Sequence, residues 1–213
     1  MNLELQGITT VFFPSDNISK NHIFEMYDIF KQNKNLSISN FSMNTDMLLP
    51  PVEFPLLSFS IEDWKCSFRS NRIECQIRTG KDCTISENIF TPLISIFKEF
   101  SNNIIVNRLG LVARYKFDEN IPEIKKHYLR KEFCEDTFRL EAIAFAKKIT
   151  VENISAFDNV QITTTNPLII RDINTGTLKE NLHLDMLQKI CNEATKLFSK
   201  SAIENIIYGS ISK

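Results

Sequence analysis

The sequence lacks the motifs that identify several classes of protein. It has five glycines and one tryptophan in 213 residues, and it contains no glycine-rich phosphate loop and no Gly-x-Ser-x-Gly, His-Glu-x-x-His or Cys-x-x-Cys motif. No segment approaches the roughly 20 apolar residues that a membrane-spanning helix needs. The first residues lack the cationic start and apolar run of a signal peptide. From these absences we expect neither an enzyme that carries one of these motifs nor a membrane protein. We also expect no cofactor and no metal.

The chain also lacks an excess of charge of either sign, and its cysteines follow no recognisable spacing. The formal net charge is -1 and the pI about 6.3, so the whole chain exerts no strong pull on nucleic acid or on acidic membranes. The cysteines are five, an odd number, which favours reduced thiols in a cytoplasm over a disulfide framework. Hydrophobic residues make up 43% and charged residues 24%, as in folded globular proteins.

Apolar periodicity in the first half predicts strands and helices in mixed order. A strand over 3–13 precedes a helix over 20–33 with Ser19 as its N-cap, and a short strand covers 36–41. Three strands follow at 56–61, 64–69 and 72–78, the last two joined by a tight turn at Ser70-Asn71. Thr91-Pro92 begins another helix, and a long strand covers 104–117.

The second half continues in the same manner. A basic helix is expected over 123–133 and a strand over 137–151. Strands over 160–165 and 176–184 are expected to be joined by a hairpin turn at Asn174-Thr175-Gly176. An apolar stripe that includes Leu187, Ile190 and Ala194 predicts a C-terminal helix, and Ser201 to Glu204 matches a capping box for a short final one.

Together these elements predict an α+β fold with mostly antiparallel sheets in two similar halves, each covered by one or two helices. The proline-containing stretch 43–55 is the best candidate for a linker. It would divide an N-terminal strand-helix-strand unit, 1–49, from a main α+β sheet domain, 50–213. A single compact domain, 1–213, is the alternative.

The long strand predicts a basic face. Ile105, Leu109, Leu111, Ala113, Tyr115 and Phe117 share one side of it by alternation, while Val106, Arg108, Gly110, Val112, Arg114 and Lys116 share the other. If the neighbouring hairpin pairs nearby, a binding face would gather Arg69, Arg72, Arg78, Arg108, Arg114 and Lys116, with Trp64, Phe68 and Tyr115 close to it. The alternative is an ordinary exposed face balanced by Glu62, Asp63, Glu74 and Asp118.

Three other sets of residues offer chemistry. His183 and Asp185 would share one face of the predicted strand, as an acid–base or metal pair requires, although solvated polar residues explain them as well. Cys66, Cys75 and Cys83 could converge on zinc, or serve as buried small hydrophobes, which we favour. Asp158, Asp172 and Asp185 could form a carboxylate site, but nothing in the sequence fixes their separation.

The chain resembles a sporadically distributed family of bacterial α+β proteins of about this size that has no established activity. The resemblance rests on Val11-Phe12-Phe13 in the opening strand, on Trp64-Lys-Cys-Ser-Phe68 before a polar turn, and on Asn107-Arg-Leu-Gly-Leu111 followed by Tyr115. Late in the chain it adds Leu184-Asp-Met186 before a helix that carries Phe198. The resemblance implies the fold more than any function.

Three functional hypotheses follow. The first is a non-catalytic cytoplasmic binding or assembly protein that acts through a protein partner or as a homo-oligomer, as an accessory of a mobile-element or antiphage system. The second is a nucleic-acid-binding module that uses the basic sheet face. The third is a hydrolase or nuclease whose carboxylates and His183 gather only in the fold. Enzyme is the less favoured class.

Overall fold

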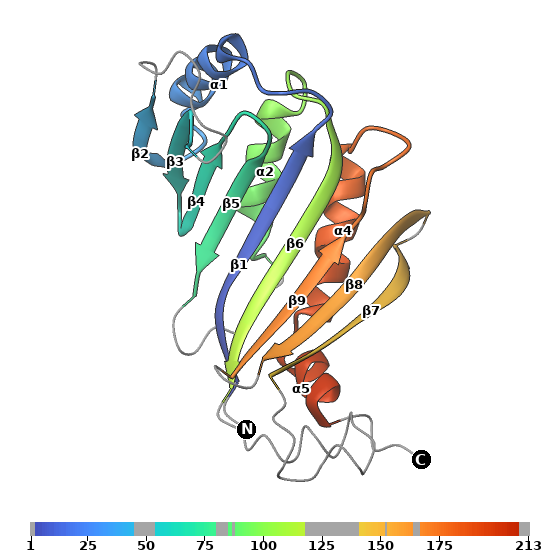
Figure 1. Cartoon of the computed structure of the whole chain (residues 1–213). Helices are drawn as coiled ribbons and strands as arrows, with labels where there is room; N and C mark the ends of the chain where they lie inside the picture. Colours follow the sequence, from blue (N-terminus) through green and yellow to red (C-terminus); the bar gives the residue numbers. More distant parts are fainter. Residues whose placement is uncertain are drawn as a thin grey trace.

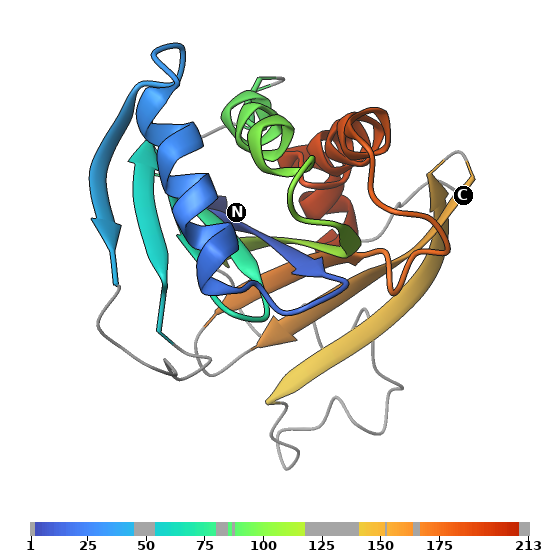
Figure 2. The same cartoon turned by 90° about the horizontal axis from the view of Figure 1, so that it is seen from above.

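A computed structural model describes residues 3–44, 54–79, 85–86, 88–117, 141–151, 153–163 and 167–208. Its nine strands form one antiparallel sheet in the order β2-β3-β4-β5-β1-β6-β9-β8-β7. The described helices all lie on the same side of this sheet, behind it in Figure 1 and above it in Figure 2. The α+β class and the antiparallel pairing predicted from the sequence are therefore confirmed.

The first half of the sheet comes from the N-terminal part of the chain. Its strands are β1 (Leu3–Pro14), β2 (Ile38–Met43), β3 (Leu57–Ile61), β4 (Trp64–Phe68) and β5 (Ile73–Arg78). On β4, Trp64, Cys66 and Phe68 are buried while the residues between them are not, so only one side of the strand faces the core. The hairpin between β4 and β5 agrees with the sequence prediction.

The second half comes from the C-terminal part of the chain. Its strands are β6 (Val106–Phe117), β7 (Ala142–Val151), β8 (Ile154–Thr163) and β9 (Leu168–Asn174). The two halves are continuous, because β1 and β6 pair antiparallel from Leu3↔Phe117 to Pro14↔Val106. The N-terminal segment thus lies at the centre of the sheet, between β5 and β6.

The described helices are α1 (Lys20–Gln32), α2 (Thr91–Phe100), α4 (Leu184–Leu197) and α5 (Lys200–Tyr208). Ser19 caps α1 as predicted, since its side chain accepts a hydrogen bond from the His22 backbone N–H. The apolar side of α2 packs on the sheet through Phe97 and Phe100, whose rings each lie 5.4 Å from that of Phe12 on β1. One continuous cluster of buried side chains fills the space between helices and sheet.

The alternation predicted for β6 holds from Leu109 to Phe117 but fails at its start. Val106 is buried and Ile105 is 49% exposed, the reverse of the prediction. Pro14 pairs with Val106 whereas Phe13 pairs with Arg108, so β6 has one extra residue there. This β-bulge exchanges the two faces of the strand, which a strict period of two cannot anticipate.

The prediction after β9 was wrong. Leu168–Asn174 is itself a strand and pairs with β8, whereas no strand covers 176–184. Thr175, Leu178 and Leu182 donate backbone hydrogen bonds to Leu109, Asn107 and Val106 at intervals too wide for a ladder. The apolar alternation near Leu182 and Leu184 therefore belongs to an extended segment and then to the first turn of α4. The basic helix expected over 123–133 lies outside the described residues, as do 137–140.

Candidate functional site

The side of the sheet opposite the helices is the candidate site. Within the described ranges no helix lies on it, and it faces the viewer in Figure 1. We call it the open face. Cross-strand pairs define its rows: one is Arg78–Gly7–Arg114–Ile170–Gln161–Ala144 and the next is Lys65–Gln76–Thr9–Val112–Asp172–Asn159–Ala146. Residues on neighbouring strands are thus held at fixed, short spacing.

The structure places the six predicted basic residues on this open face. Arg78 and Arg114 stand on either side of Gly7, because β5 and β6 both pair with β1. Arg108 and Lys116 follow on β6 by alternation. Arg69 and Arg72 flank the β4–β5 turn and approach Glu74 of the open face within 3.9 and 3.6 Å.

The aromatic residues expected beside this row lie on the other side of the sheet. Trp64, Phe68 and Tyr115 are at most 3% exposed and point into the core. The prediction that they accompany the cations was wrong, because alternation puts them one residue out of phase with the basic row. Aromatic side chains that do lie on the open face include Phe157, which is 48% exposed and stands opposite Asn174, and the half-buried Phe13, which pairs with Arg108.

Several of the cations already have partners. Arg114 Nη1 donates a hydrogen bond to Thr9 Oγ1 at 2.9 Å. Arg108 Nε donates to Asn174 Oδ1 at 3.2 Å, and its guanidinium carbon lies 4.7 Å from the centroid of the Phe13 ring. These contacts fix the two side chains against the sheet, so they present cationic charge with little freedom to move.

A polar hollow of about 400 Å³ lies over β4 and β5. We call it the β4–β5 hollow; it is lined by Asp63, Lys65, Ser67, Arg69, Glu74, Gln76 and Arg78. The Glu74 carboxylate forms ion pairs with Arg69 and Arg72, and its Oε1 accepts a hydrogen bond from the Gln76 amide. The Nε–H of Arg69 is buried and finds no hydrogen-bond acceptor in the described part of the chain. Lys65, Ser67 and Gln76 were not predicted as site residues, although alternation within 64–69 and 72–78 placed them on the face of the arginines.

A second depression, of about 420 Å³, lies at the other end of the open face. We call it the β8 groove; its lining includes Val112, Ala144, Ala146, Asn159, Gln161, Ile170 and Asp172. Burial raises the pKa of the Asp172 carboxyl above its usual range, although the Asn159 amide, Arg108 and Arg114 all favour the charged form. Asn159 Nδ2 donates to Asp172 Oδ2 at 3.4 Å. The sequence offered Asp172 only as a catalytic carboxylate, and small alanines on β7 gave no signal of a groove.

Gly7 occupies a place where no other residue fits. A Cβ atom there would lie 2.5 Å from the backbone carbonyl oxygen of Ile77, and the β1–β6 register shifts between Leu5 and Gly7. Any side chain would force β1 and β5 apart. The sheet surface between Arg78 and Arg114 is consequently bare backbone.

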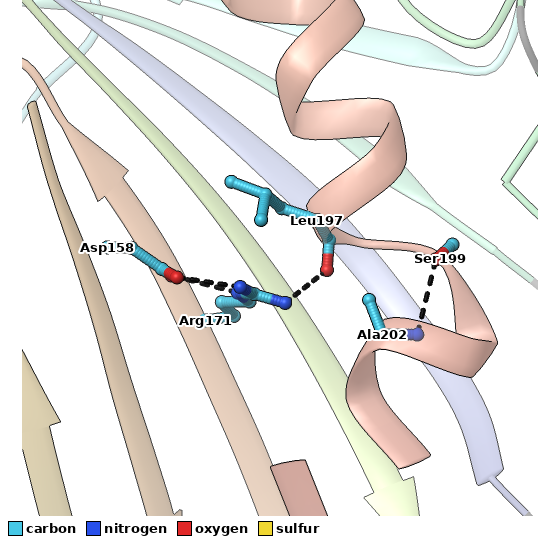
Figure 3. Close-up of polar contacts among 5 residues, drawn as sticks. All are labelled: Asp158, Arg171, Leu197, Ser199 and Ala202. Atoms are coloured by element: carbon cyan, nitrogen blue, oxygen red, sulfur yellow. Dashed lines mark hydrogen bonds and ion pairs between the residues drawn. The ribbon is translucent and has the colours of Figure 1, made fainter. Parts of the chain in front are cut away.

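The carboxylates proposed for catalysis do not come together. Asp158 lies on the helix side and forms an ion pair with Arg171, drawn in Figure 3. Asp172 is on the open face, so the sheet separates it from Asp158 and from Asp185, which belongs to the first turn of α4 in the helix layer. His183 is the N-cap residue of α4 and does not share a strand with Asp185, which corrects the sequence prediction.

The cysteines behave in part as expected. Cys66 and Cys75 stand directly opposite each other on β4 and β5 and are fully buried. Burial raises the pKa of the Cys75 thiol, which favours its neutral form. Cys83, the third residue of the alternative zinc site, lies outside the described residues, and those that are described hold no group of three or more metal-ligating side chains.

No helix in the described ranges is long and apolar enough to cross a membrane. No model of a known protein family matches the chain, and no curated protein matches its sequence.

Proposed function

We propose that this protein is a non-catalytic binding protein that docks a protein partner on its open face. The observation that carries the proposal is the charge of this face. Its cations are Lys65, Arg69, Arg72, Arg78, Arg108, Arg114, Lys116 and Lys148, and its carboxylates are Glu4, Asp63, Glu74 and Asp172. The whole chain has a formal net charge of -1, so positive charge is concentrated on one side. A partner with an acidic surface complements it.

The dimensions of the open face support docking of a folded partner or a long segment. Nine strands spaced about 4.8 Å apart, several of them ten residues or longer, give a surface well above the roughly 800 Å² that each partner contributes to a typical stable interface. Valine, isoleucine and leucine side chains alternate there with amides and charges, among them Val112, Ile170 and Leu168. Such a mixture is usual for protein interfaces.

Single-stranded nucleic acid is a second candidate for the same face. Phe157 is 48% exposed and could stack on a base, and Lys148 stands opposite it. Against this, Glu74 and Asp172 lie among the cations, and the Phe13 ring is already covered by the Arg108 guanidinium. These features favour protein over nucleic acid.

The cellular setting forms part of the proposal. Membership of the sporadically distributed bacterial family, a cytoplasmic location and an accessory role in a mobile-element or antiphage system rest on the sequence resemblance and on the odd number of cysteines in the sequence. The binding function itself rests on the open face and stands without them.

Photo-crosslinking from the two sides of the sheet tests the proposal. A photoreactive residue replaces Gln161, which is exposed on the open face, or Lys98, which is exposed on α2 in the helix layer. In cells of the source organism we expect a defined protein adduct from position 161 and none from position 98. The additional substitution Arg114→Glu should reduce the yield at position 161. A nuclease-sensitive adduct would favour the second candidate, and equal adducts from both positions would exclude a specific docking face.

A further inference from the structure

The β4–β5 hollow is lined by cationic side chains that find no hydrogen-bond acceptor among the described residues. The side chains of Lys65 and Arg78 are exposed and make no hydrogen bond or ion pair with another described residue, and the buried Nε of Arg69 lies 3.9 Å from Glu74 Oε2, too far for a hydrogen bond. Of these, only the Arg69 Nε–H is a buried donor without an acceptor, which destabilises a fold by an amount comparable to a lost hydrogen bond, whereas the exposed Lys65 and Arg78 are available to bind a ligand. Donors gathered around one hollow therefore indicate a place for an anion.

We infer that the β4–β5 hollow is an oxyanion site that accepts one carboxylate from an acidic segment of the partner protein. This inference rests on the function proposed above and names the chemistry of the partner. Lys65 on β4 and Arg78 on β5 would hold the carboxylate oxygens by charge-assisted hydrogen bonds, and Ser67, two residues after Lys65 on β4, would supply a neutral donor.

The charge of the hollow fits a group with a single negative charge. Its lining contains three cations, Lys65, Arg69 and Arg78, and two carboxylates, Asp63 and Glu74. Glu74 is held from three sides, since Gln76 donates to it and Arg69 and Arg72 lie within 3.9 and 3.6 Å. One positive charge remains in excess along the lining. A carboxylate neutralises it, whereas a phosphate dianion would leave an uncompensated negative charge beside Asp63 and Glu74.

The residues that line the hollow also favour a carboxylate over a nucleotide. None of its lining residues is aromatic, so a base would find no ring on which to stack. Lys65 pairs with Gln76 and Ser67 pairs with Glu74 across β4 and β5, which holds the donors in place on two hydrogen-bonded strands. Donors fixed in advance bind an anion with less loss of side-chain freedom.

Titration with a fluorescently labelled hexaglutamate peptide at low salt, read by anisotropy, tests the inference. We expect saturable binding that Lys65→Gln and Arg78→Gln each weaken by about tenfold, as for loss of a hydrogen bond to a charged group. Arg69→Lys keeps the charge but removes the Nε–H, and we expect it to lower the affinity for the peptide by less than Lys65→Gln or Arg78→Gln does. Lys98→Gln, on α2, makes the same charge change in the helix layer and should leave the affinity unchanged. Circular dichroism of each variant verifies that it is folded.

Pyrophosphate and a dodecathymidine oligonucleotide are the competing probes. Tighter binding of either one, with the same dependence on Lys65 and Arg78, would overturn the carboxylate assignment. Equal binding of hexaglutamate to the wild type, Lys65→Gln and Arg78→Gln, or no saturable binding, would overturn the site itself.

The crosslinking experiment separates this inference from the proposed function, because Gln161 lies in the other half of the sheet. A protein adduct at position 161 that survives Lys65→Gln and Arg78→Gln would keep the docking face and remove the carboxylate site. Binding of hexaglutamate by the hollow without any protein adduct would support the site and contradict protein docking.

Discussion

Arg171 and Asp158 form a bidentate ion pair on the helix side of the sheet. Arg171 Nε lies 2.8 Å from Asp158 Oδ1 and Nη2 lies 2.6 Å from Oδ2, and both side chains are almost fully buried. The remaining guanidinium donor, Nη1, bonds the carbonyl oxygen of Leu197 at the end of α4, as Figure 3 shows. One arginine thus joins β8, β9 and the last turn of α4.

Arg171→Met should strongly destabilise the protein. The substitution leaves the Asp158 carboxylate buried without its counter-charge and removes the partner of the Leu197 carbonyl. Loss of one member of a buried ion pair typically lowers the free energy of unfolding by about 3–5 kcal/mol. Urea unfolding followed by circular dichroism measures the change.

The double variant Arg171→Met/Asp158→Leu is the control. It removes both charges, so we expect it to be more stable than Arg171→Met alone. If the two variants unfold at the same urea concentration, the pair does not couple these strands as the geometry indicates.

Tyr115→Phe removes a second link between the sheet and α4. The Tyr115 hydroxyl donates to the carbonyl oxygen of Phe198, so its loss should lower the free energy of unfolding by about 1–3 kcal/mol at neutral pH. Burial raises the pKa of the Tyr115 phenol above its usual value, with Arg171 acting in the opposite sense. The contribution of Tyr115 to stability is therefore complete below about pH 10, where an unfolded tyrosine ionises, and is lost as the pH rises further.

Unfolding of both proteins between pH 7 and pH 11 tests this dependence. The difference between wild type and Tyr115→Phe should shrink above pH 10. Tyr27→Phe serves as the control, because the Tyr27 hydroxyl bonds an exposed lysine, Lys31, on α1. A difference that stays constant across this pH range would contradict the buried, neutral state of Tyr115.

The sequence predicted the strands best where one side of each is buried. The alternation of Leu109, Leu111 and Ala113 was correct because a single apolar core covers that side of β6. It failed at Ile105 and Val106, where a bulge set by the pairing with Pro14 shifts the pattern by one residue. Local periodicity carries no information about such a pairing over 90 residues of chain.

The candidate site was predictable only in part, for the same reason. Alternation assigned Arg114 and Arg78 each to one side of its own strand. That the two flank Gly7 depends on β1 inserting between β5 and β6, which is a long-range pairing. The β8 groove gave no signal, since it arises from small side chains on β7 next to amides on β8. His183 and Asp185 were misplaced because an extended segment and a strand share the same alternation.

Thr10→Val should raise stability. The Thr10 hydroxyl is fully buried on the helix side and finds no hydrogen-bond partner among the described residues. Valine has nearly the same shape and avoids burying an unpaired polar group, so we expect a gain of about 1 kcal/mol in the free energy of unfolding.

Thr9→Val is the matched control, one residue earlier on the open face. It removes the acceptor of the Arg114 hydrogen bond at 2.9 Å and should lower stability by about 0.5–1.5 kcal/mol. Thermal unfolding of the two variants should therefore shift in opposite directions. A loss of stability for Thr10→Val equal to that for Thr9→Val would show that the Thr10 hydroxyl has a partner.

Asp172→Asn should stabilise the protein at neutral pH. Burial in the β8 groove raises the pKa of the Asp172 carboxyl in the folded state, so the fold disfavours its charged form. A carboxyl with a raised pKa stabilises the fold fully only below its pKa in the unfolded chain, which is near 4. This contribution is lost as the pH rises through the pKa of the same carboxyl in the folded protein. Asparagine carries no charge and retains an acceptor for the Asn159 amide, which bonds Asp172 at 3.4 Å.

The gain from Asp172→Asn should consequently be largest at pH 7 and should diminish as the pH approaches 4 in urea unfolding experiments. Asp185→Asn makes the same chemical change in the first turn of α4, where a carboxylate favours the helix N-terminus, and should lower stability by about 0.3–1 kcal/mol. A gain for Asp172→Asn that is the same at pH 4 and pH 7 would mean that desolvation of the carboxylate is not its source. A true gain implies that Asp172 is retained at the expense of stability, as expected for a residue that contacts a partner on the open face.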